Sequence, residues 1–209
     1  ELVKALEALK DLPCETTDHY RLPLWVNTGL MTDVVRSLER GAEGVGLYRT
    51  EVPFLLRDRF PSEEEQRSIY QEQLSAFAPH TVTMRTLDIG GDKSLSYFPI
   101  EEENPFLGWR GIRVTLDHPE IFMVQVRAML KASDGLDNLR IMLPMVTSVI
   151  EAEEAQHLIH RAWLEVRDEG LDIPMPQVGV MIEVPAAVYQ ARALAQRVDF
   201  LSIGTNDLT

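Results

Sequence analysis

Several apolar runs of the sequence carry or end in side chains that could do chemistry. These side chains are Arg49, Arg85, Glu183, Asn206 and Asp207. Two carboxylates can hold one Mg²⁺ ion, which prefers oxygen ligands and keeps water or substrate oxygens in its other positions. Two arginines offer fork-shaped donors to phosphate or carboxylate groups, and an asparagine amide can donate to the same anion. The set therefore favours a small, multiply charged phospho-acid as ligand, with metal and arginines stabilising charge during phosphoryl transfer.

These residues also have structural interpretations. Arg49 could form a surface ion pair with Glu51 or Glu39, and Asp207 could cap a helix. Glu183 directly follows an apolar strand, where a carboxylate is costly to bury unless it is paired or bound to metal. Burial therefore favours a metal or a cationic partner for Glu183.

The long stretch 88–118 is a second place where function is expected. It exceeds an ordinary connection between a strand and a helix, and long structured insertions of this kind are usually functional. Asp88 and Lys93 either belong to the site or shape a glycine turn. Arg110 and Arg113 either bind the ligand or pin the loop through ion pairs. The residue types leave these alternatives open.

Short apolar runs alternate with amphipathic helical patterns along the chain. Strands are predicted at 24–27, 44–48, 82–87, 139–143, 177–182 and 200–203. Helices are predicted at 2–12, 32–40, 62–78, 119–132, 148–169 and 185–197. The third of these helices begins with a capping box formed by Ser62 and Glu65. Because strands alternate with helices, the pattern predicts βαβ units and a parallel sheet.

Two α/β architectures contain such units, an open doubly wound sheet and a (β/α)8 barrel. No glycine-rich phosphate loop follows the first strand, so the main signature of a dinucleotide-binding sheet is missing. A barrel needs eight strands and about 250 residues, whereas six strands are predicted in these 209 residues. We therefore expect a TIM barrel truncated after about six strands. Residues 1–18 would form an N-terminal helix and linker, and 19–209 the incomplete barrel.

The carboxyl ends of parallel barrel strands converge on one face, which is where active sites lie. That face would bring together the charged and amide residues named above. The sequence stops at the loop-like residues 204–209 without a finished element after them. We therefore expect the chain to be a piece of a longer protein, cut within its active-site face.

Composition narrows the class of protein. Lysine and arginine total 20 and aspartate and glutamate total 33, for a net charge of −13. This balance argues against a nucleic-acid surface, because phosphate affinity there comes from clustered lysine and arginine. One cysteine rules out an internal disulfide framework and suits the reducing cytosol. The apolar stretches fall far short of the ~20 residues of a membrane span, and no secretory pattern is present.

Four long motifs make the sequence similar to a known family. They are GAEGVGLYRTE at 41–51, RTLDIGGDK at 85–93, ENPFLGWRGIR at 103–113 and GTNDLT at 204–209. Together they resemble the C-terminal phosphoenolpyruvate-binding domain of enzyme I of the bacterial phosphotransferase system, in the family's order and over nearly the whole chain. The sequence at 108–113 and 141–146 resembles the nitrogen-related branch of that family.

The resemblance implies a TIM barrel of the phosphoenolpyruvate-utilising type and assigns substrate contacts. Arg49 and Arg85 match the arginines that bind the phosphate of phosphoenolpyruvate. Asn206 matches a substrate-contacting asparagine, and Arg110 a further active-site arginine. Asp207 matches a residue that lies at both substrate and metal.

The same resemblance implies a metal, partners and a location. Glu183 and Asp207 match the family's Mg²⁺ ligands. In the family the phosphoryl group passes from phosphoenolpyruvate to a histidine on a separate domain, and then to a small histidine-bearing phosphocarrier protein. The resemblance further implies a cytoplasmic homodimer that binds neither nucleic acid nor membrane.

Two parts of the family's machinery have no counterpart in these residues. The phosphorylated histidine lies on another domain, and the cysteine that protonates the pyruvate enolate lies beyond the motif at 204–209. Cys14 cannot replace that cysteine by position. We therefore expect no catalytic residue in this chain and no turnover by the chain alone.

Two alternative functions remain open on the sequence. A pyruvate phosphate dikinase or phosphoenolpyruvate synthase has the same kind of barrel but requires an ATP-grasp domain elsewhere in the protein. A non-catalytic regulatory or dimerisation module would not require the joint retention of the metal and anion residues. That retention favours the phosphotransferase.

Overall fold

Six parallel strands form one sheet in the computed structural model, which describes residues 2–91, 93–99 and 108–208. The strands are β1 (Val26–Thr28), β2 (Val45–Arg49), β3 (Val82–Arg85), β4 (Leu139–Leu143), β5 (Gln177–Ile182) and β6 (Phe200–Ile203). The helices are α1 (Leu2–Glu7), α2 (Thr32–Glu39), α3 (Glu51–Leu55), α4 (Glu63–Phe77), α5 (Ile112–Asp117), α6 (Pro119–Ala132), α7 (Val149–Asp168), α8 (Pro185–Tyr189), α9 (Ala191–Ala195) and α10 (Thr205–Leu208).

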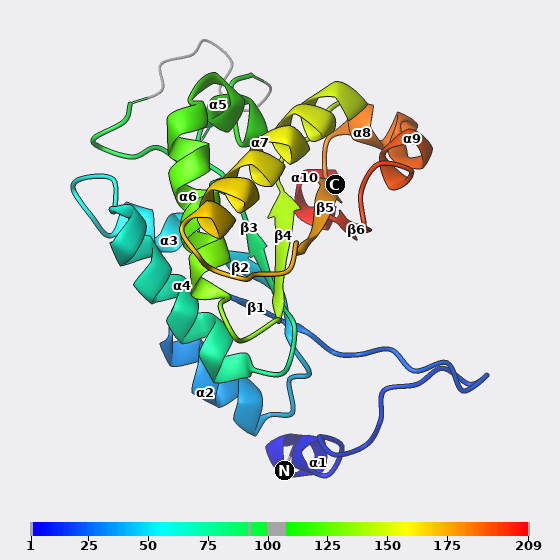
Figure 1. Cartoon of the computed structure of the whole chain (residues 1–209). Helices are drawn as coiled ribbons and strands as arrows, with labels where there is room; N and C mark the ends of the chain where they lie inside the picture. Colours follow the sequence, from blue (N-terminus) through cyan, green and yellow to red (C-terminus); the bar gives the residue numbers. More distant parts are fainter. Residues whose placement is uncertain (1, 92, 100–107, 209) are drawn as a thin grey trace.

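Strand order in the sheet follows the order of the sequence from β1 to β6, and every pair is parallel. The sheet curls into a half-barrel, with α2, α4, α6 and α7 along one of its faces (Figure 1). Consecutive order with helical crossovers is the arrangement of a (β/α) barrel rather than of a doubly wound sheet, in which the order reverses. The predicted α/β barrel-type fold with six strands is therefore confirmed.

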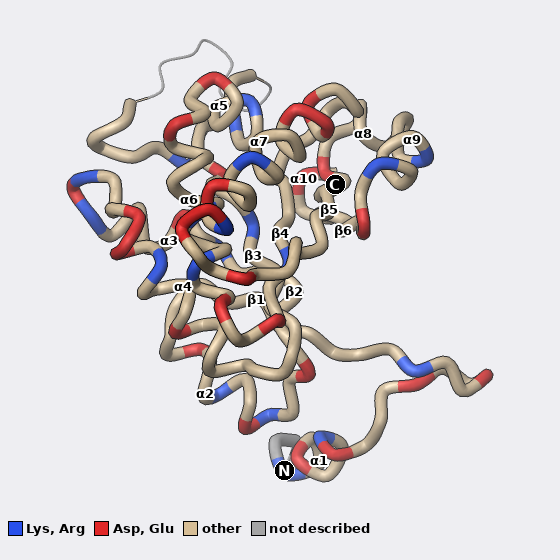
Figure 2. Tube along the Cα trace, in the orientation of Figure 1, with Lys and Arg blue, Asp and Glu red and all other residues tan. Residues whose placement is uncertain are grey.

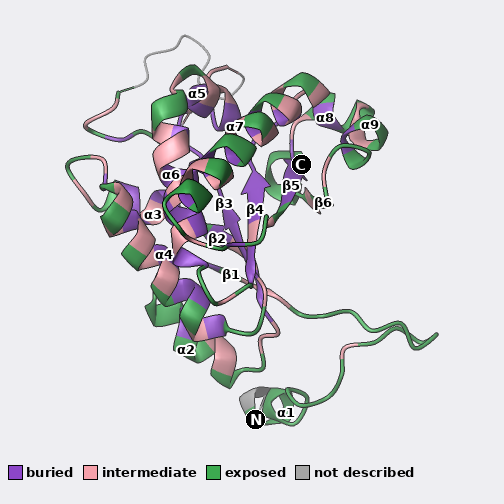
Figure 3. Ribbon diagram, viewed as in Figure 1, coloured by how far each residue is buried: buried purple, intermediate pink, exposed green. Residues whose placement is uncertain are grey.

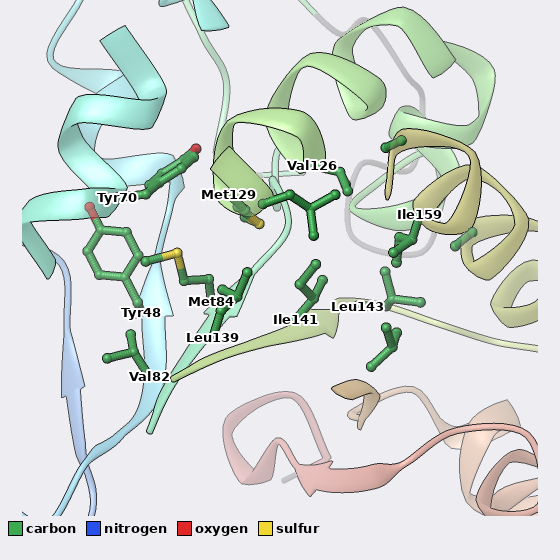
Figure 4. Close-up of a cluster of buried hydrophobic side chains, with 14 of the residues drawn as sticks. Tyr48, Tyr70, Val82, Met84, Val126, Met129, Leu139, Ile141, Leu143 and Ile159 are labelled. Carbon is green, nitrogen blue, oxygen red and sulfur yellow. The ribbon is translucent and has the colours of Figure 1, made fainter. Parts of the chain in front are cut away.

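The main hydrophobic core lies between the sheet and these helices. Leu139, Ile141 and Leu143 alternate along β4 and are buried in it, as the two-residue period of a strand requires. Val126 and Met129 of α6 pack toward the same cluster (Figure 4). Burial is concentrated on the strands and on the inward sides of the helices, while the outward sides are exposed (Figure 3). The core thus fixes which strand residues remain available on the other face of the sheet.

A buried polar chain connects this core to the end of β3. The hydroxyl of Tyr70 donates to Gln66 over 3.0 Å, and the amide of Gln125 donates to that hydroxyl over 3.1 Å. The Gln125 carbonyl accepts the backbone N–H of Leu87 at 2.8 Å. Buried polar groups that are fully hydrogen-bonded make a structure more rigid. These hydrogen bonds therefore anchor the segment just before Asp88 to α4 and α6.

Acidic and basic residues are interspersed over α4, α6 and α7 (Figure 2). Lys131 of α6 lies 2.6 Å from Glu63 and 2.5 Å from Glu169, and Arg127 pairs with the same two glutamates. These ion pairs join the beginning of α4 to α6 and the residue that ends α7. Arg127 and Lys131 of this outer layer are thus engaged by acidic neighbours.

Most predicted elements are found close to their predicted positions. The helix over 119–132 has the predicted bounds, and the capping box is present, with both Ser62 and Glu65 making their reciprocal hydrogen bonds. The single helix predicted over 185–197 is wrong, because α8 and α9 are separated at Gln190. The Gln190 side chain donates to the carbonyl of Thr147 over 3.0 Å, which holds this break against the beginning of α7.

The long segment after β3 is structured where the structure describes it. Two isolated antiparallel bridges, Gly90 with Lys93 and Leu95 with Phe98, fold it back on itself. Its apolar side chains join a second small core around Phe54 of α3. The helix α5 was not predicted from the sequence. Residues 92 and 100–107 lie outside the described residues, so 103–107 of the third motif are not placed.

The N-terminal helix is shorter than predicted. It ends at Glu7, and turns follow over 8–11. Leu6, Leu9 and Leu12 are all exposed. Most helical stability comes from packing, and no described residue covers these leucines in a way that would extend the helix. Among the described helices, none is both long and apolar enough to cross a membrane.

Candidate functional site

A cavity of about 670 Å³ opens at the carboxyl ends of the strands. Its walls come mainly from β2, β5 and β6 and from the residues that end β3 and begin α10. It is lined by all six residues predicted for the site: Arg49, Arg85, Arg110, Glu183, Asn206 and Asp207. Segments separated by as much as 158 positions in the sequence thus meet at the face where barrel enzymes place their chemistry.

Arg49 and Arg85 lie side by side on neighbouring strands. Their Cα atoms are register partners in the pairing of β2 with β3. Arg85 is 5% exposed, whereas Arg49 is exposed on the cavity wall. Within the described residues, Arg49 forms neither of the ion pairs considered above, since Glu51 pairs with Arg85 instead. One arginine is therefore fixed in the floor, and its neighbour is left accessible to a ligand.

Arg85 is held by two buried carboxylates and by the backbone. Its Nη2 lies 2.6 Å from Glu51 Oε1 and 3.1 Å from Asp88 Oδ2. Thr50 Oγ1 donates to the Arg85 carbonyl over 2.7 Å. In the part of the chain that the structure describes, Arg85 Nε is buried without an acceptor and Glu51 Oε2 without a donor. A buried donor without a partner is costly, so Arg85 retains hydrogen-bonding capacity that an anion would fulfil.

Asp88 is the shared partner of three cations. Arg85 and Lys93 each lie 3.1 Å from its Oδ2, and Arg110 Nε lies 3.4 Å from its Oδ1. Its side chain is completely buried. Burial acts to raise the pKa of Asp88, but the three cations outweigh it and hold that pKa below its ordinary value. Asp88 is therefore an ionised centre at neutral pH, around which these cations are arranged.

Arg110 connects this cluster to the last part of the site. Its Nη1 lies 3.7 Å from Asp207 Oδ1, in addition to its contact with Asp88. Arg113, in contrast, lies 3.9 Å from Glu151 and donates to the carbonyl of Gly108. Of the two arginines left undecided by the sequence, Arg110 lies on the cavity wall, and Arg113 ties the loop to α7.

Glu183 is a buried carboxylate in acidic surroundings. It is 2% exposed, and its Oε1 accepts the backbone N–H of Met145 at 2.8 Å. Burial raises the pKa of Glu183 to about 7, with the charges of Asp88 and Asp207 adding to the rise and Arg85 opposing it. A nearby cation would reverse this balance and favour the ionised form.

Gly204 allows β6 to pass very close to Glu183. A Cβ at this glycine would lie 2.7 Å from Glu183 Cβ and 3.1 Å from Glu183 Oε2. The absence of a side chain keeps space beside that oxygen. The residues after Gly204 form α10 rather than the predicted loop, and Asn206 and Asp207 are exposed on it beside the cavity.

The donor set fits a magnesium ion held by few protein ligands. Among the described residues, no group of three or more His, Cys, Asp and Glu side chains is arranged to hold a metal. Mg²⁺ commonly uses only one or two carboxylates and completes its octahedron with water and substrate oxygens. Glu183 and Asp207 supply two carboxylates on the same cavity, and the space that Gly204 leaves at Glu183 Oε2 is open to an ion.

Sequence reasoning missed how Glu51 participates and left Asp88 and Lys93 undecided. Glu51 was considered only as a surface partner of Arg49, but it is buried and holds Arg85. The available signal was its position, since an acidic residue two places after a buried strand faces a desolvation cost unless it is paired. A partner from another strand was not visible in the local sequence.

A family model and several curated proteins match this chain. The family model described as "PEP-utilising enzyme, PEP-binding domain" matches residues 3–209. The chain is 52% identical over 210 residues to a protein of Escherichia coli (strain K12) named "Phosphoenolpyruvate-dependent phosphotransferase system". It is 47% identical over 206 residues to a protein of Haemophilus influenzae named "Phosphoenolpyruvate-protein phosphotransferase".

The matched region is only part of each relative. The alignment covers 100% of this chain but 28% of the Escherichia coli protein, and 98% of this chain but 36% of the Haemophilus influenzae protein. The chain therefore corresponds to one region of much longer proteins.

Proposed function

Because the chain belongs to the PEP-utilising enzymes through their PEP-binding domain, we propose that its strand-end cavity binds phosphoenolpyruvate for a phosphoenolpyruvate–protein phosphotransferase. The observation that carries this proposal is the meeting of Arg49, Arg85 and Arg110 with Glu183 and Asp207 on one cavity. Several cations and two carboxylates in one cavity suit a ligand that is itself multiply anionic and binds together with a divalent metal.

The arginines and Asn206 would bind the substrate. Arg49 and Arg85 lie on adjacent strands, so their guanidinium groups can bind different oxygens of one phosphate. The buried Nε of Arg85, which has no acceptor in the described part of the chain, provides a further donor. Arg110 and Asn206 line the same cavity and would contact the same substrate.

Glu183 and Asp207 would hold Mg²⁺. The ion supplies neutralisation of the negative charge that spreads over the phosphate and enolate oxygens. Arg110 lies between Asp88 and Asp207, which orients one metal-binding carboxylate with respect to the anion site. Arg85 and the backbone N–H of Met145 stabilise the ionised form of Glu183.

In the proposed reaction the bond between phosphorus and the enol oxygen of phosphoenolpyruvate breaks, and a bond to a histidine nitrogen forms. The enolate left behind takes up a proton and becomes pyruvate. We propose that this histidine lies on another domain and passes the phosphoryl group to a histidine-bearing phosphocarrier protein. A cytoplasmic homodimer of the nitrogen-related branch is part of the same proposal. The residues at 108–113 and 141–146 support only the assignment to that branch.

Calorimetric titration of phosphoenolpyruvate into the protein, with and without Mg²⁺, tests this function. We expect binding that depends on Mg²⁺ and that is lost in Arg49→Met. Arg161→Met, which removes an exposed arginine on α7, is the matched control and should bind normally. Failure of phosphoenolpyruvate to bind in the presence of Mg²⁺ would contradict the proposal.

A transfer assay separates the phosphotransferase from the dikinase. The full-length protein is incubated with phosphoenolpyruvate and phosphocarrier protein, with no nucleotide added. We expect the carrier to be phosphorylated by the full-length protein and not by residues 1–209 alone. A strict requirement for a nucleotide would favour the dikinase instead.

A further inference from the structure

Lys93 is brought to the cavity by a tight turn after β3. The backbone N–H of Gly90 donates to the Lys93 carbonyl over 2.8 Å, and the N–H of Lys93 donates to the Gly90 carbonyl over 3.0 Å. Gly90 has φ of +110°, and a Cβ there would lie 2.6 Å from the carbonyl oxygen of Trp109. Only glycine accepts both conditions. The turn is therefore fixed against the segment that carries Arg110.

The ammonium group of Lys93 is held by two buried carboxylates. Its Nζ lies 3.1 Å from Asp88 Oδ2 and 3.4 Å from Glu51 Oε1. These carboxylates also hold Arg85, so Lys93 and Arg85 share both of their partners. A lysine used only to close a turn would need no such pair of buried partners. Its charge is instead built into the wall beside Arg85.

Lys93 also keeps an accessible surface. Its side chain is 30% exposed and lines the cavity together with Arg49 and Glu183. An ammonium group has three N–H donors, and two acceptors contact this one in the described part of the chain. Arg85, the neighbouring cation, is only 5% exposed. Lys93 is therefore better placed than Arg85 to meet a ligand at the cavity surface.

The charges of the cluster favour an incoming anion. Three cations, Arg85, Lys93 and Arg110, share the two buried carboxylates of Glu51 and Asp88. Arg110 also pairs with Asp207, and a metal ion bound at Asp207 would leave the cluster with a net positive charge. A point charge on a flexible stem can follow the oxygen of an anion without strict orientation.

We infer that Lys93 is a further substrate-binding residue, whose ammonium group contacts an anionic oxygen of bound phosphoenolpyruvate and is positioned by Asp88 and Glu51. This inference rests on the proposed function, because it concerns the same cavity and ligand. It adds a contact that the arginines alone do not supply.

The first test compares Lys93→Met with Lys131→Met in the protein at its full natural length. Lys131 is also paired with two carboxylates, but it lies on α6 in the outer helical layer. We expect Lys93→Met to raise the Kd for phosphoenolpyruvate in the presence of Mg²⁺ by about tenfold or more, the scale of a lost charge-assisted hydrogen bond. Lys131→Met should leave it within about twofold. Lys93→Arg keeps the charge and should recover part of the affinity.

A second test uses the unaltered protein and so does not depend on a variant that folds. Lysines are acetylated with a limiting amount of an amine-reactive ester, and the rate at each lysine is read by mass spectrometry. Phosphoenolpyruvate with Mg²⁺ should slow the modification of Lys93 about fivefold or more and leave that of Lys131 unchanged.

The outcomes separate this inference from the function on which it rests. If the unaltered protein shows no Mg²⁺-dependent binding of phosphoenolpyruvate, both the proposed function and the role of Lys93 are wrong. If the unaltered protein binds while Lys93→Met binds equally well and Lys93 is not protected, only the role of Lys93 is wrong. The lysine would then serve the glycine turn alone.

Discussion

Nη2 of Arg85 lies 2.6 Å from Oε1 of Glu51, and both side chains are almost completely buried at the floor of the cavity. The two residues come from different βα units and are 34 positions apart. Leaving one charge of such a pair buried without its partner is strongly destabilising. This pair therefore joins the stability of the fold to the orientation of a proposed phosphate-binding arginine.

Replacing Glu51 with alanine should destabilise the protein. Arg85 would keep only Asp88 as a carboxylate partner, and we expect a loss of about 3 kcal/mol in the free energy of unfolding. Urea denaturation at pH 7 measures it. Glu64→Ala removes an exposed carboxylate that pairs with Arg67 on α4 and should have a much smaller effect. Equal losses in the two variants would contradict the importance given to the buried pair.

Glu183 should make stability fall with rising pH in the absence of metal. Its pKa is raised from 4.5 to about 7 in the folded protein. The folded state therefore favours the protonated carboxyl group, and its contribution is full below pH 4.5 and is lost as pH rises to about 7. Glu183→Gln lacks this loss and should be more stable than the unaltered protein at pH 8, by roughly 3 kcal/mol, with no such advantage at pH 4.5.

Urea titrations between pH 4.5 and pH 8 in the presence of EDTA check this dependence. Glu154→Gln changes an exposed glutamate on α7 and should follow the pH profile of the unaltered protein. A flat difference between Glu183→Gln and the unaltered protein over this range would show that burial does not perturb Glu183.

Adding Mg²⁺ should stabilise the folded protein through Glu183 and Asp207. A ligand at 100 times its Kd adds about 2.7 kcal/mol to the free energy of unfolding, which raises the Tm, and EDTA should reverse the rise. Asp207→Asn should abolish the rise. Asp134→Asn, an exposed change after α6, should preserve it. Persistence of the full rise in Asp207→Asn would place the ion elsewhere.

Gly204→Ala should damage the same region by steric means. The added Cβ would lie 2.7 Å from Glu183 Cβ, which is closer than real Cβ contacts. We expect a destabilisation of about 1–3 kcal/mol, typical of overpacking, together with a weaker response of the Tm to Mg²⁺. Gly46→Ala adds a Cβ at 3.5 Å from Trp25, an ordinary contact, and is the control, on β2. If the two variants behave alike, space at Gly204 is not needed.

Elements with a strong local signal could be predicted from the sequence. The helix over 119–132 begins with a proline and carries a long apolar face, and the helix from Glu63 has its capping box, so both were found. The helices α3 and α5 have five and six residues, which is too short for a helical period to be read. They form because their apolar residues pack into the second core around Phe54.

The residues that line the cavity could be predicted from the charged side chains at strand ends. The ion pairs that these residues form with one another could not. Arg49, Arg85 and Glu183 stand out because charged residues end apolar runs, and the topology of parallel strands brings those ends together. That Arg85 faces Glu51, and that Lys93 shares its partners, depends on register and on a glycine turn. Such pairings join positions that are far apart in the sequence, so the spacing of nearby residues does not predict them.

Within the described residues, each strand of the sheet is hydrogen-bonded only to the strands that precede and follow it in the chain. This part of the sheet can grow one unit at a time while the ribosome extends the chain, since each of the strands β2–β6 pairs with the strand made just before it. Arg49, Arg85 and Lys93 then emerge well before Glu183 and Asp207. During synthesis the anion-binding part of the cavity is therefore expected to exist before the part proposed to hold the metal.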